Sequence, residues 1–287
     1  MNRKNIFSLA WLLLALTAPL AAQSAAVSQP PQLSWQGSWK PGALLVAVPP
    51  AGYQLYWQGK LLPVDRDGRV LLGLQRDAQG EVALDIERRE TGQRWPLLYP
   101  LQHRDYVIQR VEGVPQQTVT PPPEQLQRIR REAALVAAAR SSMLDQPLYA
   151  SGFQPPAEGP ISGVYGSQRF YNGEPGRPHY GVDYAAPLGA AVTAPAAGRV
   201  VLAEADLFYS GGTVIVDHGF QLYSSFLHMS EVSVAVGDNL EPGDKIGEVG
   251  ASGRATGPHL DWRMNWGQTR IDPLLVLQAL PKAAHSD

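Results

Sequence analysis

Glycine is concentrated in the C-terminal half of the chain, and this limits what that half can fold into. Of the 28 glycines, 19 lie between residues 152 and 273. They separate short strand-like runs at 190–202, 213–216, 222–227, 232–236 and 245–249. Turn signals such as Gly211-Gly212 and Glu241-Pro242-Gly243-Asp244 lie among these runs. Short strands joined by tight turns predict an antiparallel β domain.

The N-terminal half carries a second series of strand-like runs, at 43–48, 53–57, 70–74, 82–86 and 106–111. Turn signals separate them at regular short spacing, which is typical of a small β-sandwich or β-barrel. Four tryptophans lie in this half: Trp35, Trp39, Trp57 and Trp95. Their spacing forms no single exposed face, so we expect them to pack in a core rather than to form a glycan-binding row.

A proline-bearing stretch at 114–123 separates the two halves. After it, apolar residues recur at steps of three and four, at Leu126, Ile129, Ala133 and Val136. This spacing predicts one amphipathic helix within 124–144. Its charged face is expected to be solvated (Arg128, Arg131 and Glu132). The predicted fold is therefore mainly β, with an accessory β domain at 27–114, a linker and helix at 115–145 and a C-terminal β domain at 146–282.

The first 26 residues have the composition of a secretory signal peptide. Arg3 and Lys4 precede an apolar stretch at 6–16, and small residues suited to cleavage follow at 20–26. The apolar stretch is shorter than the ~20 residues that a membrane helix requires. We therefore expect an exported chain with no membrane span after signal removal. The formal net charge of −2 gives no basic footprint for nucleic acid.

Candidate metal ligands come from two short motifs. The chain has no cysteine, so a metal would have to be held by His, Asp or Glu. In an extended segment His179 and Asp183 share one face, and in a strand His259 and Asp261 share one face while Leu260 points the other way, toward a core. His179, Asp183 and Asp261 make three candidate ligands. A catalytic zinc that keeps one position open for water has that number.

Two further histidines could act on the reacting groups. His228 ends an apolar run, and His259 precedes Asp261 by two residues. Imidazoles can move the proton of a zinc-activated water and stabilise the oxyanion that forms on a peptide carbonyl. His218 lies where a strand enters a turn and is expected to be structural. No Gly-x-Ser-x-Gly turn supports a serine hydrolase.

The order of these motifs resembles the LytM/lysostaphin-type zinc metallopeptidases, which cut peptide bonds in peptidoglycan. The resemblance covers about residues 152–277 and is carried by segments 179–187, 194–201, 214–219, 227–230, 236–238, 250–260 and 272–273. It implies a LytM-type antiparallel sheet in which His179 and Asp183 bind Zn²⁺ and His228 and His259 are catalytic. The accessory region is similar to that of exported Gram-negative members. The resemblance therefore also implies a periplasmic enzyme that cuts a D,D-type cross-link between peptidoglycan peptide stems.

One residue departs from the family pattern. The family has His-x-His where this chain has His259-Leu260-Asp261. Asp is a normal zinc ligand and can reach a metal that an imidazole Nδ1 would bind. However, two carboxylates and one imidazole cancel the charge of Zn²⁺, so the metal would acidify water less. We expect a slower enzyme, or one shifted to higher pH or to a metal that favours oxygen ligands.

Three interpretations remain open from the sequence. The first is a zinc endopeptidase acting on peptidoglycan cross-links. The second is a non-catalytic LytM-like protein that binds the wall and activates a separate amidase, which the Asp261 substitution favours. The third treats His259 and Asp261 as a hydrogen-bonded pair in a structural sheet. Retention of His179, Asp183, His228 and His259 favours the enzyme. The accessory domain could be a lid, a glycan-binding module or a docking module.

Overall fold

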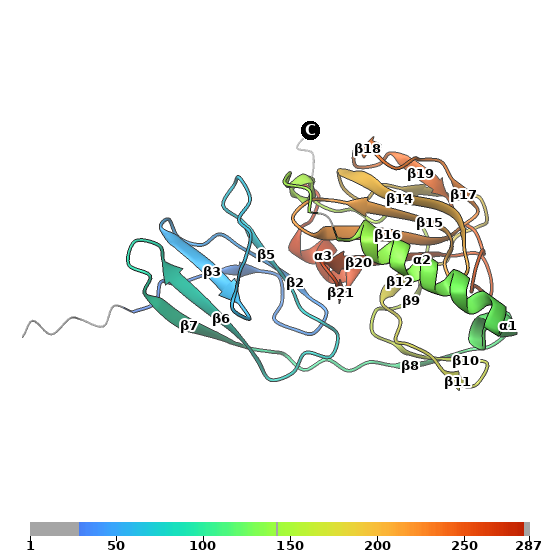
Figure 1. The fold of residues 1–287 in the computed structure, drawn as a ribbon, viewed down its shortest axis with the longest axis horizontal. Coiled ribbons are helices and arrows are strands. Elements are labelled where there is room, and N and C mark those ends of the chain that lie inside the picture. The colour runs from blue at the N-terminus through green and yellow to red at the C-terminus, as the bar shows by residue number, and fades with distance from the viewer. Residues whose placement is uncertain (1–28, 142, 284–287) are drawn as a thin grey trace, which may run out of the picture. The chain divides into compact units, whose positions relative to one another are not determined.

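The computed structural model describes residues 29–141 and 143–283. The predicted signal peptide lies outside these residues. No helix in the described part of the chain is long and apolar enough to cross a membrane. The described residues from Pro31 onward group as one compact unit. Within it the architecture is mainly β, as predicted (Figure 1).

The N-terminal strands form two antiparallel sheets. The first has the order β1-β2-β5, with β1 (Trp35–Gln36), β2 (Leu44–Ala47) and β5 (Val70–Gly73). The second has the order β4-β3-β6-β7, with β4 (Lys60–Leu61), β3 (Tyr53–Trp57), β6 (Glu81–Arg88) and β7 (Arg94–Pro100). Trp95 is buried, and Trp35, Trp39 and Trp57 pack partly buried against the same core. The tryptophans therefore serve packing, as expected.

The C-terminal half is built on an eight-stranded antiparallel sheet. Its order is β18-β14-β15-β16-β20-β12-β9, and β21 pairs with β20. The strands are β9 (Ile161–Gly163), β12 (Gly181–Tyr184), β14 (Gly198–Leu207), β15 (Gly211–Asp217), β16 (Leu222–Met229), β18 (Asn239–Leu240), β20 (Leu260–Trp266) and β21 (Thr269–Ile271). A smaller sheet has the order β13-β19-β17, with β13 (Ala191–Thr193), β17 (Glu231–Val232) and β19 (Lys245–Glu248).

Two of the expected strands were too long. The run at 190–202 is broken at residues 194–197 and contributes to both β13 and β14. The break occurs where Ala194 N–H and Ala194 C=O bond to Asp244 and Gly243 instead of continuing the ladder to β19. The run at 232–236 is a strand only as far as Val232, because a turn closed by Asp238 follows it.

A third small sheet joins the two halves of the chain. It has the order β11-β10-β8, with β8 (Ile108–Val111), β10 (Gln168–Tyr171) and β11 (Glu174–Pro175). β8 pairs with β10 in parallel, whereas the C-terminal sheet is antiparallel throughout. Residues predicted to end the accessory domain therefore lie beside β10, which ends eight residues before His179.

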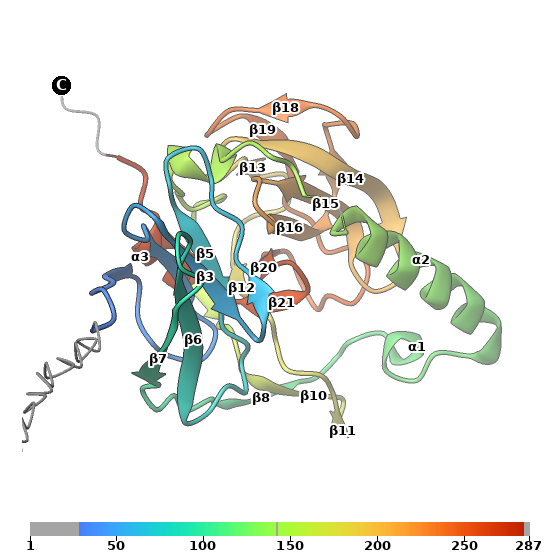
Figure 2. The same cartoon turned by 60° about the vertical axis from the view of Figure 1, so that its left-hand side comes forward.

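The long helix begins at the predicted place and ends early. α2 (Leu126–Ala139) follows α1 (Gln116–Val119) and a 3-10 turn at Pro123–Gln125, and Arg140 is its C-cap. Val136 and Ala139 pack on Leu202, Leu207, Ile215 and Tyr223, so α2 covers one face of the large sheet (Figures 1 and 2).

The expected solvated face of α2 was wrong for two of its three residues. Arg128 donates to the Asp206 carbonyl at 2.6 Å, and Glu132 accepts from the Phe208 amide at 2.8 Å. Only Arg131 is exposed. The charged face binds the end of β14, because the strand's terminal backbone groups need partners there.

The two halves share one core. Trp57 contacts Trp266 with ring centroids 5.7 Å apart, and the hydrophobic cluster runs from Ala43 to Val276. The Tyr149 hydroxyl, in a 3-10 turn at Leu148–Ser151, donates to Asp65 at 2.5 Å. Asp272 caps α3 (Pro273–Ala279) and pairs with Arg104 at 2.5 Å. The boundaries drawn at residues 114 and 146 stay a prediction.

Candidate active site

The registers of three strands bring the predicted ligands to one face of the large sheet. Asp183 on β12 lies opposite Asp261 on β20, and Ser225 on β16 lies opposite Arg263 on β20. Paired residues point to the same face of a sheet. Leu260 points away and is fully buried in the core, as predicted. The alternation of β20 therefore directs Asp261 and Arg263 into the same cleft.

His179, Asp183 and Asp261 converge on one point. Each offers a ligand atom within 4.8 Å of the others, and all three residues are buried. His179 Nε2 lies 3.0 Å from Asp183 Oδ1, and His179 Nδ1 lies 4.0 Å from Asp261 Oδ2. Both imidazole nitrogens and Asp183 Oδ1 lack a hydrogen-bond partner among the described residues. Buried polar atoms are normally paired, so this convergence fits a shared metal ion.

Two glycines leave the space that the carboxylates occupy. A Cβ on Gly163 would lie 2.1 Å from Asp183 Oδ2, and a Cβ on Gly181 would lie 2.3 Å from Asp261 Oδ1. Neither distance is possible between non-bonded atoms. The glycines of β9 and β12 are therefore part of what positions the two candidate carboxylate ligands.

Each carboxylate is paired with an arginine. Arg263 donates from Nε to Asp261 Oδ1 at 3.0 Å and from Nη2 to Asp261 Oδ2 at 2.5 Å. Arg169, on β10, donates to Asp183 Oδ2 and also to Gln109 Oε1 on β8 at 3.1 Å. Burial opposes ionisation of Asp261, but the Arg263 charge prevails and holds the pKa of that carboxyl well below its usual range. Burial and the charge of Asp261 oppose ionisation of Asp183 too, but His179 and Arg169 outweigh them and lower the pKa of that carboxyl. Both carboxylates are therefore charged at neutral pH.

Arg263 changes the net charge that the sequence predicts for the three candidate metal ligands. The ion pair Asp261–Arg263 has no net charge, as a neutral imidazole has none. Each carboxylate oxygen has two lone pairs, so Asp261 can accept from Arg263 and still bind a cation. The three residues thus fit a metal in donor type and placement, with an arginine that offsets the extra carboxylate.

His228 enters the cleft because the strand is irregular. Along β16, Phe226 and Met229 belong to the core, whereas both Leu227 and His228 line the cleft. The pairing with β15 shifts register between Gly212 and Val214, which is a β-bulge, and His228 has a φ of 67°. A bulge re-aims a side chain that simple alternation would point to the other face. The left-handed backbone at a non-glycine residue is a strained feature of the kind found at functional sites.

The two predicted catalytic histidines are neighbours. Their ring centroids are 4.8 Å apart, and His228 Nε2 lies 4.0 Å from Asp261 Oδ2. His228 Nδ1 donates to the Ser252 carbonyl at 2.8 Å, which leaves Nε2 with a lone pair. Burial lowers the pKa of His228 to about 4, although the charge of Asp261 opposes this. His228 is therefore neutral at pH 7. His259 Nδ1 lies 2.9 Å from the Gly257 carbonyl.

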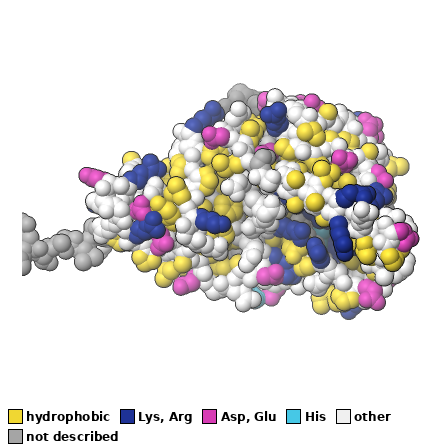
Figure 3. All heavy atoms as spheres, viewed as in Figure 1, with side chains coloured by type: hydrophobic (Ala, Val, Ile, Leu, Met, Phe, Trp, Pro, Cys, Tyr) yellow, Lys and Arg dark blue, Asp and Glu magenta, His cyan; other side chains and the backbone are white. Residues whose placement is uncertain are grey.

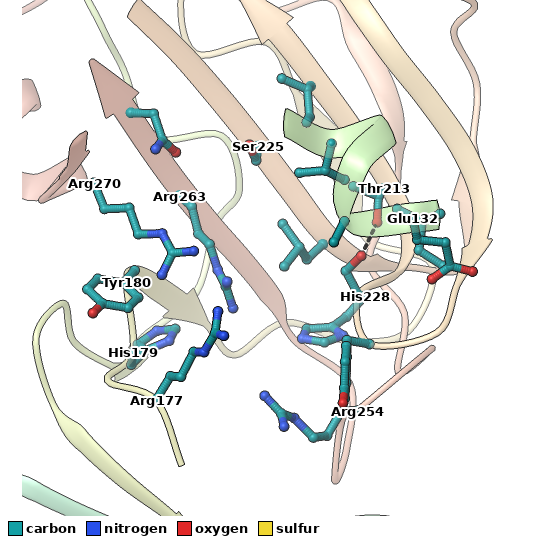
Figure 4. A pocket seen from close by; sticks show the side chains of 18 of the residues that line it. Glu132, Arg177, His179, Tyr180, Thr213, Ser225, His228, Arg254, Arg263 and Arg270 are labelled. Carbon is teal, nitrogen blue, oxygen red and sulfur yellow. Dashed lines mark hydrogen bonds between the residues drawn. The ribbon is translucent and has the colours of Figure 1, made fainter. Parts of the chain in front are cut away.

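A cavity of about 460 Å³ lies between α2 and the sheet (Figure 4). His179 and His228 face each other across it, whereas His259 is not among its lining residues. Six arginines line it: Arg140, Arg169, Arg177, Arg254, Arg263 and Arg270. In Figure 3 several basic side chains gather around a hollow on this face. The site is thus much more basic than the chain's net charge suggests.

Sequence reasoning missed most of these arginines. Arg263 could have been found, because it follows Asp261 by two residues and strand alternation puts both on one face. Arg140, Arg254 and Arg270 come from three distant segments, and no local pattern connects them. His218 is buried and bonded at both ring nitrogens, to Ala197 and Ser224, in the structural role expected.

A protein-family model matches the part of the chain that contains most of these site residues. Residues 177–273, which contain His179, Asp183, His228 and Asp261, match the model of peptidase family M23. We call this stretch the M23 domain, after the family model that it matches. The resemblance that the motifs carry is thereby confirmed, while the individual roles of the ligands and histidines stay predictions.

Individual relatives agree with this assignment. The M23 domain region is similar to peptidoglycan DD-endopeptidase ShyB of Vibrio cholerae, with 32% identity over 137 residues, or 48% of this chain and 29% of that protein. It is also similar to DD-carboxypeptidase/endopeptidase Mpg of Neisseria meningitidis, with 35% identity over 39% of this chain and 25% of that protein. The chain thus spans less than a third of the length of these relatives.

One solved structure matches most of the chain. A Pseudomonas aeruginosa protein assigned to peptidase M23 has a TM-score of 0.65 and 29% identity, covering 85% of this chain and 97% of that one. The match extends well beyond the 97 residues of the M23 domain. The N-terminal sheets and the M23 domain therefore occur together in a second protein.

Proposed function

We propose that this chain is an exported zinc endopeptidase that hydrolyses peptide cross-links of peptidoglycan in the periplasm. The observation that carries the proposal is the convergence of His179, Asp183 and Asp261 on one point, where the described residues offer the His179 imidazole no hydrogen-bond partner. The M23 domain and the names of its relatives supply the reaction class and the substrate.

His179, Asp183 and Asp261 would hold the metal. Zinc bound there would supply Lewis-acid activation of the reacting groups. Arg263 and Arg169 hold the carboxylates in place, and Arg263 offsets the charge that Asp261 adds relative to an imidazole.

His228 and His259 handle protons and developing charge. His228 is neutral at pH 7 and holds a free lone pair at Nε2, so it can accept a proton there. His259 lies beside it with Nδ1 directed at the Gly257 carbonyl, and as an imidazolium it would donate a hydrogen bond from Nε2 to a developing oxyanion. The cleft under α2, which His228 lines, limits the access of bulk water to the His228 imidazole.

A muropeptide digest tests the proposal. The full mature chain is incubated with purified cross-linked muropeptides and zinc, with His259→Ala as the inactive variant. His103→Ala, which alters an exposed histidine in the N-terminal half, is the matched control. We expect dimers to be converted to monomers by the wild type and by the control, and not by His259→Ala or in EDTA. Equal conversion by His259→Ala would refute the assigned role.

Export is tested separately. We expect N-terminal sequencing of the protein from the periplasmic fraction to begin between residues 21 and 27. Recovery of a chain that retains Met1 from that fraction would contradict signal cleavage.

A second candidate function is favoured by the arginines. Arg169 and Arg263 already place a cation on each of the two carboxylates, which could make a metal unnecessary. The chain would then be a wall-binding protein that activates a separate amidase. Metal analysis of the purified chain separates the two functions. Stoichiometric zinc supports the peptidase, and stimulation of an amidase by zinc-free protein supports the regulator.

A further inference from the structure

The end of the cleft formed by Arg140 and Arg270 has no role in the chemistry described above. Arg140 is the C-cap of α2, and Arg270 lies on β21. Among the described residues, no carboxylate lies within 4.0 Å of either guanidinium. Two half-buried cations therefore share one end of a cavity without an anion.

Arg140 is the less satisfied of the two. Its Nε is buried and has no hydrogen-bond partner in the described structure. Its Nη1 makes only a long bond, 3.4 Å, to the side-chain oxygen of Asn265. Donors of a guanidinium are normally paired when they are removed from water. A ligand atom in the cavity could pair this donor.

Arg270 is held with its charge directed into the cavity. Its guanidinium carbon lies 4.3 Å from the centre of the Tyr180 ring, and Asn265 is its partner across the β20–β21 pair. Figure 4 shows Arg177, Arg263 and Arg270 extending toward the same space from the side of Tyr180. The ring holds the side chain at the cavity wall, where the described residues place no carboxylate within reach of its charge.

A buried hydroxyl lies on the floor of the same region. Ser225 is 4% exposed, lines the cavity and lies opposite Arg263 in the strand pairing. Its Oγ has no hydrogen-bond partner in the described part of the chain. A second unpaired polar atom therefore lies in the lining of the same cavity, on β16 rather than on α2 or β21.

The charges around this end do not balance. Of the described residues, Glu132 alone is an acidic residue in the cavity lining, and Arg128 and the Phe208 amide bind it. Burial lowers the pKa of Arg140 to about 10, and the charges of Arg270 and Arg263 lower it further. Burial and the Arg263 charge likewise lower the pKa of Arg270. A bound anion would relieve this mutual repulsion.

We propose that Arg140 and Arg270, together with the Ser225 hydroxyl, form an oxyanion subsite that binds a free carboxylate of the peptide substrate. The identity of the ligand rests on the proposed function. Planar guanidinium groups bind carboxylates by paired, charge-assisted hydrogen bonds. The subsite lies beside Tyr180, next to His179 in the chain, so a carboxylate held there fixes how the peptide lies across the candidate metal ligands.

Binding to the metal-free full chain tests the subsite without requiring hydrolysis. In EDTA, isothermal titration compares a muropeptide that keeps its free carboxylates with the same muropeptide after amidation. We expect the acid form to bind about tenfold more tightly at low salt. Arg140→Met and Arg270→Met should each remove most of this preference and leave binding of the amide unchanged.

Arg131→Met is the matched control, because Arg131 lies exposed on the same helix as Arg140. It should keep the full preference for the acid form. Without ligand, Arg140→Met should raise the melting temperature, since it removes a buried charge that has no partner. A merely structural arginine would lower it. Circular dichroism of the variants checks that each one folds.

Three outcomes overturn the subsite. They are equal binding of acid and amide, equal loss of both in the arginine variants, and no binding of either form. Tighter binding of inorganic phosphate than of the acid muropeptide, lost in Arg140→Met, would assign the site to phosphate instead of a carboxylate. If the acid preference is found but cross-links are never cut, the subsite stands and the peptidase proposal fails.

Discussion

Arg263 and Asp261 should behave as one unit in mutational experiments. The Asp261 side chain is fully buried, and the Arg263 side chain is 32% exposed. Arg263→Met leaves Asp261 buried without its cation and close to Asp183. Removing one partner of a buried pair costs about 3–5 kcal/mol. We expect a value near the lower limit, about 3 kcal/mol, because His179 and the charge of Arg169 remain nearby.

The reverse change should cost less. In Asp261→His the Arg263 side chain can turn toward water through its exposed third, so we expect about 1–2 kcal/mol. The double variant Asp261→His/Arg263→Met removes both charges and leaves neither unpaired. Its cost should therefore be at least about 2 kcal/mol smaller than the sum of the single costs.

Urea unfolding at pH 7 in EDTA measures all four proteins of this cycle. Additivity to within about 0.5 kcal/mol would refute the coupling. Zinc titration of the same proteins gives a second measure. The double variant should bind zinc more tightly than Asp261→His alone, because Arg263 then no longer repels the ion. If Asp261→His alone gains neither metal affinity nor rate at neutral pH, while the double variant gains both, Arg263 rather than Asp261 limits the site.

Other predictions concern residues outside this pair. Burial lowers the pKa of His218 to about 4 in the folded protein, against about 6.5 in the unfolded chain. Between these pH values the unfolded state therefore binds more protons. The free energy of unfolding should thus fall by about 3 kcal/mol from pH 6.5 to pH 4. Urea unfolding across this range should show a shallower fall in His218→Gln. Tyr149→Phe should cost about 1–3 kcal/mol, because it removes a donor from the buried Asp65, and an unchanged urea midpoint would contradict this. Gly181→Ala should weaken zinc binding at least about tenfold in a chelator competition, whereas Gly257→Ala, with open space around its Cβ, should not.

The sequence predicted those parts of the fold and site that follow from local patterns. Alternation placed Leu260 in the core and Asp261 on the opposite face, because both residues lie in β20. Alternation fails at His228, where a bulge puts two successive residues on the cleft face. From the residues alone His228 was one of two histidines left to act beside the candidate ligands, and the family resemblance assigned it the catalytic role. A bulge depends on the partner strand, and no property of the segment 226–229 alone reveals it.

Long-range pairing sets the remaining limit. The helix at 126–139 was predicted from its period, yet its charged side chains bind β14, which lies more than sixty residues later in the chain. The arginine cluster combines α2, β20 and β21 for the same reason. From local sequence these charged residues are expected to face solvent. They become part of the site because strands that are distant in the sequence bring them together.

The parallel pairing of β8 with β10 has a consequence for how such a protein can evolve. Gln109 on β8 bonds to Arg169, which in turn holds Asp183, so the N-terminal half is two hydrogen bonds away from a candidate metal ligand. A recombination that joined residues 146–282 to a different N-terminal module would also discard this support. We therefore expect that the M23 domain of this chain cannot be exchanged freely between proteins. Its N-terminal half should be inherited together with it.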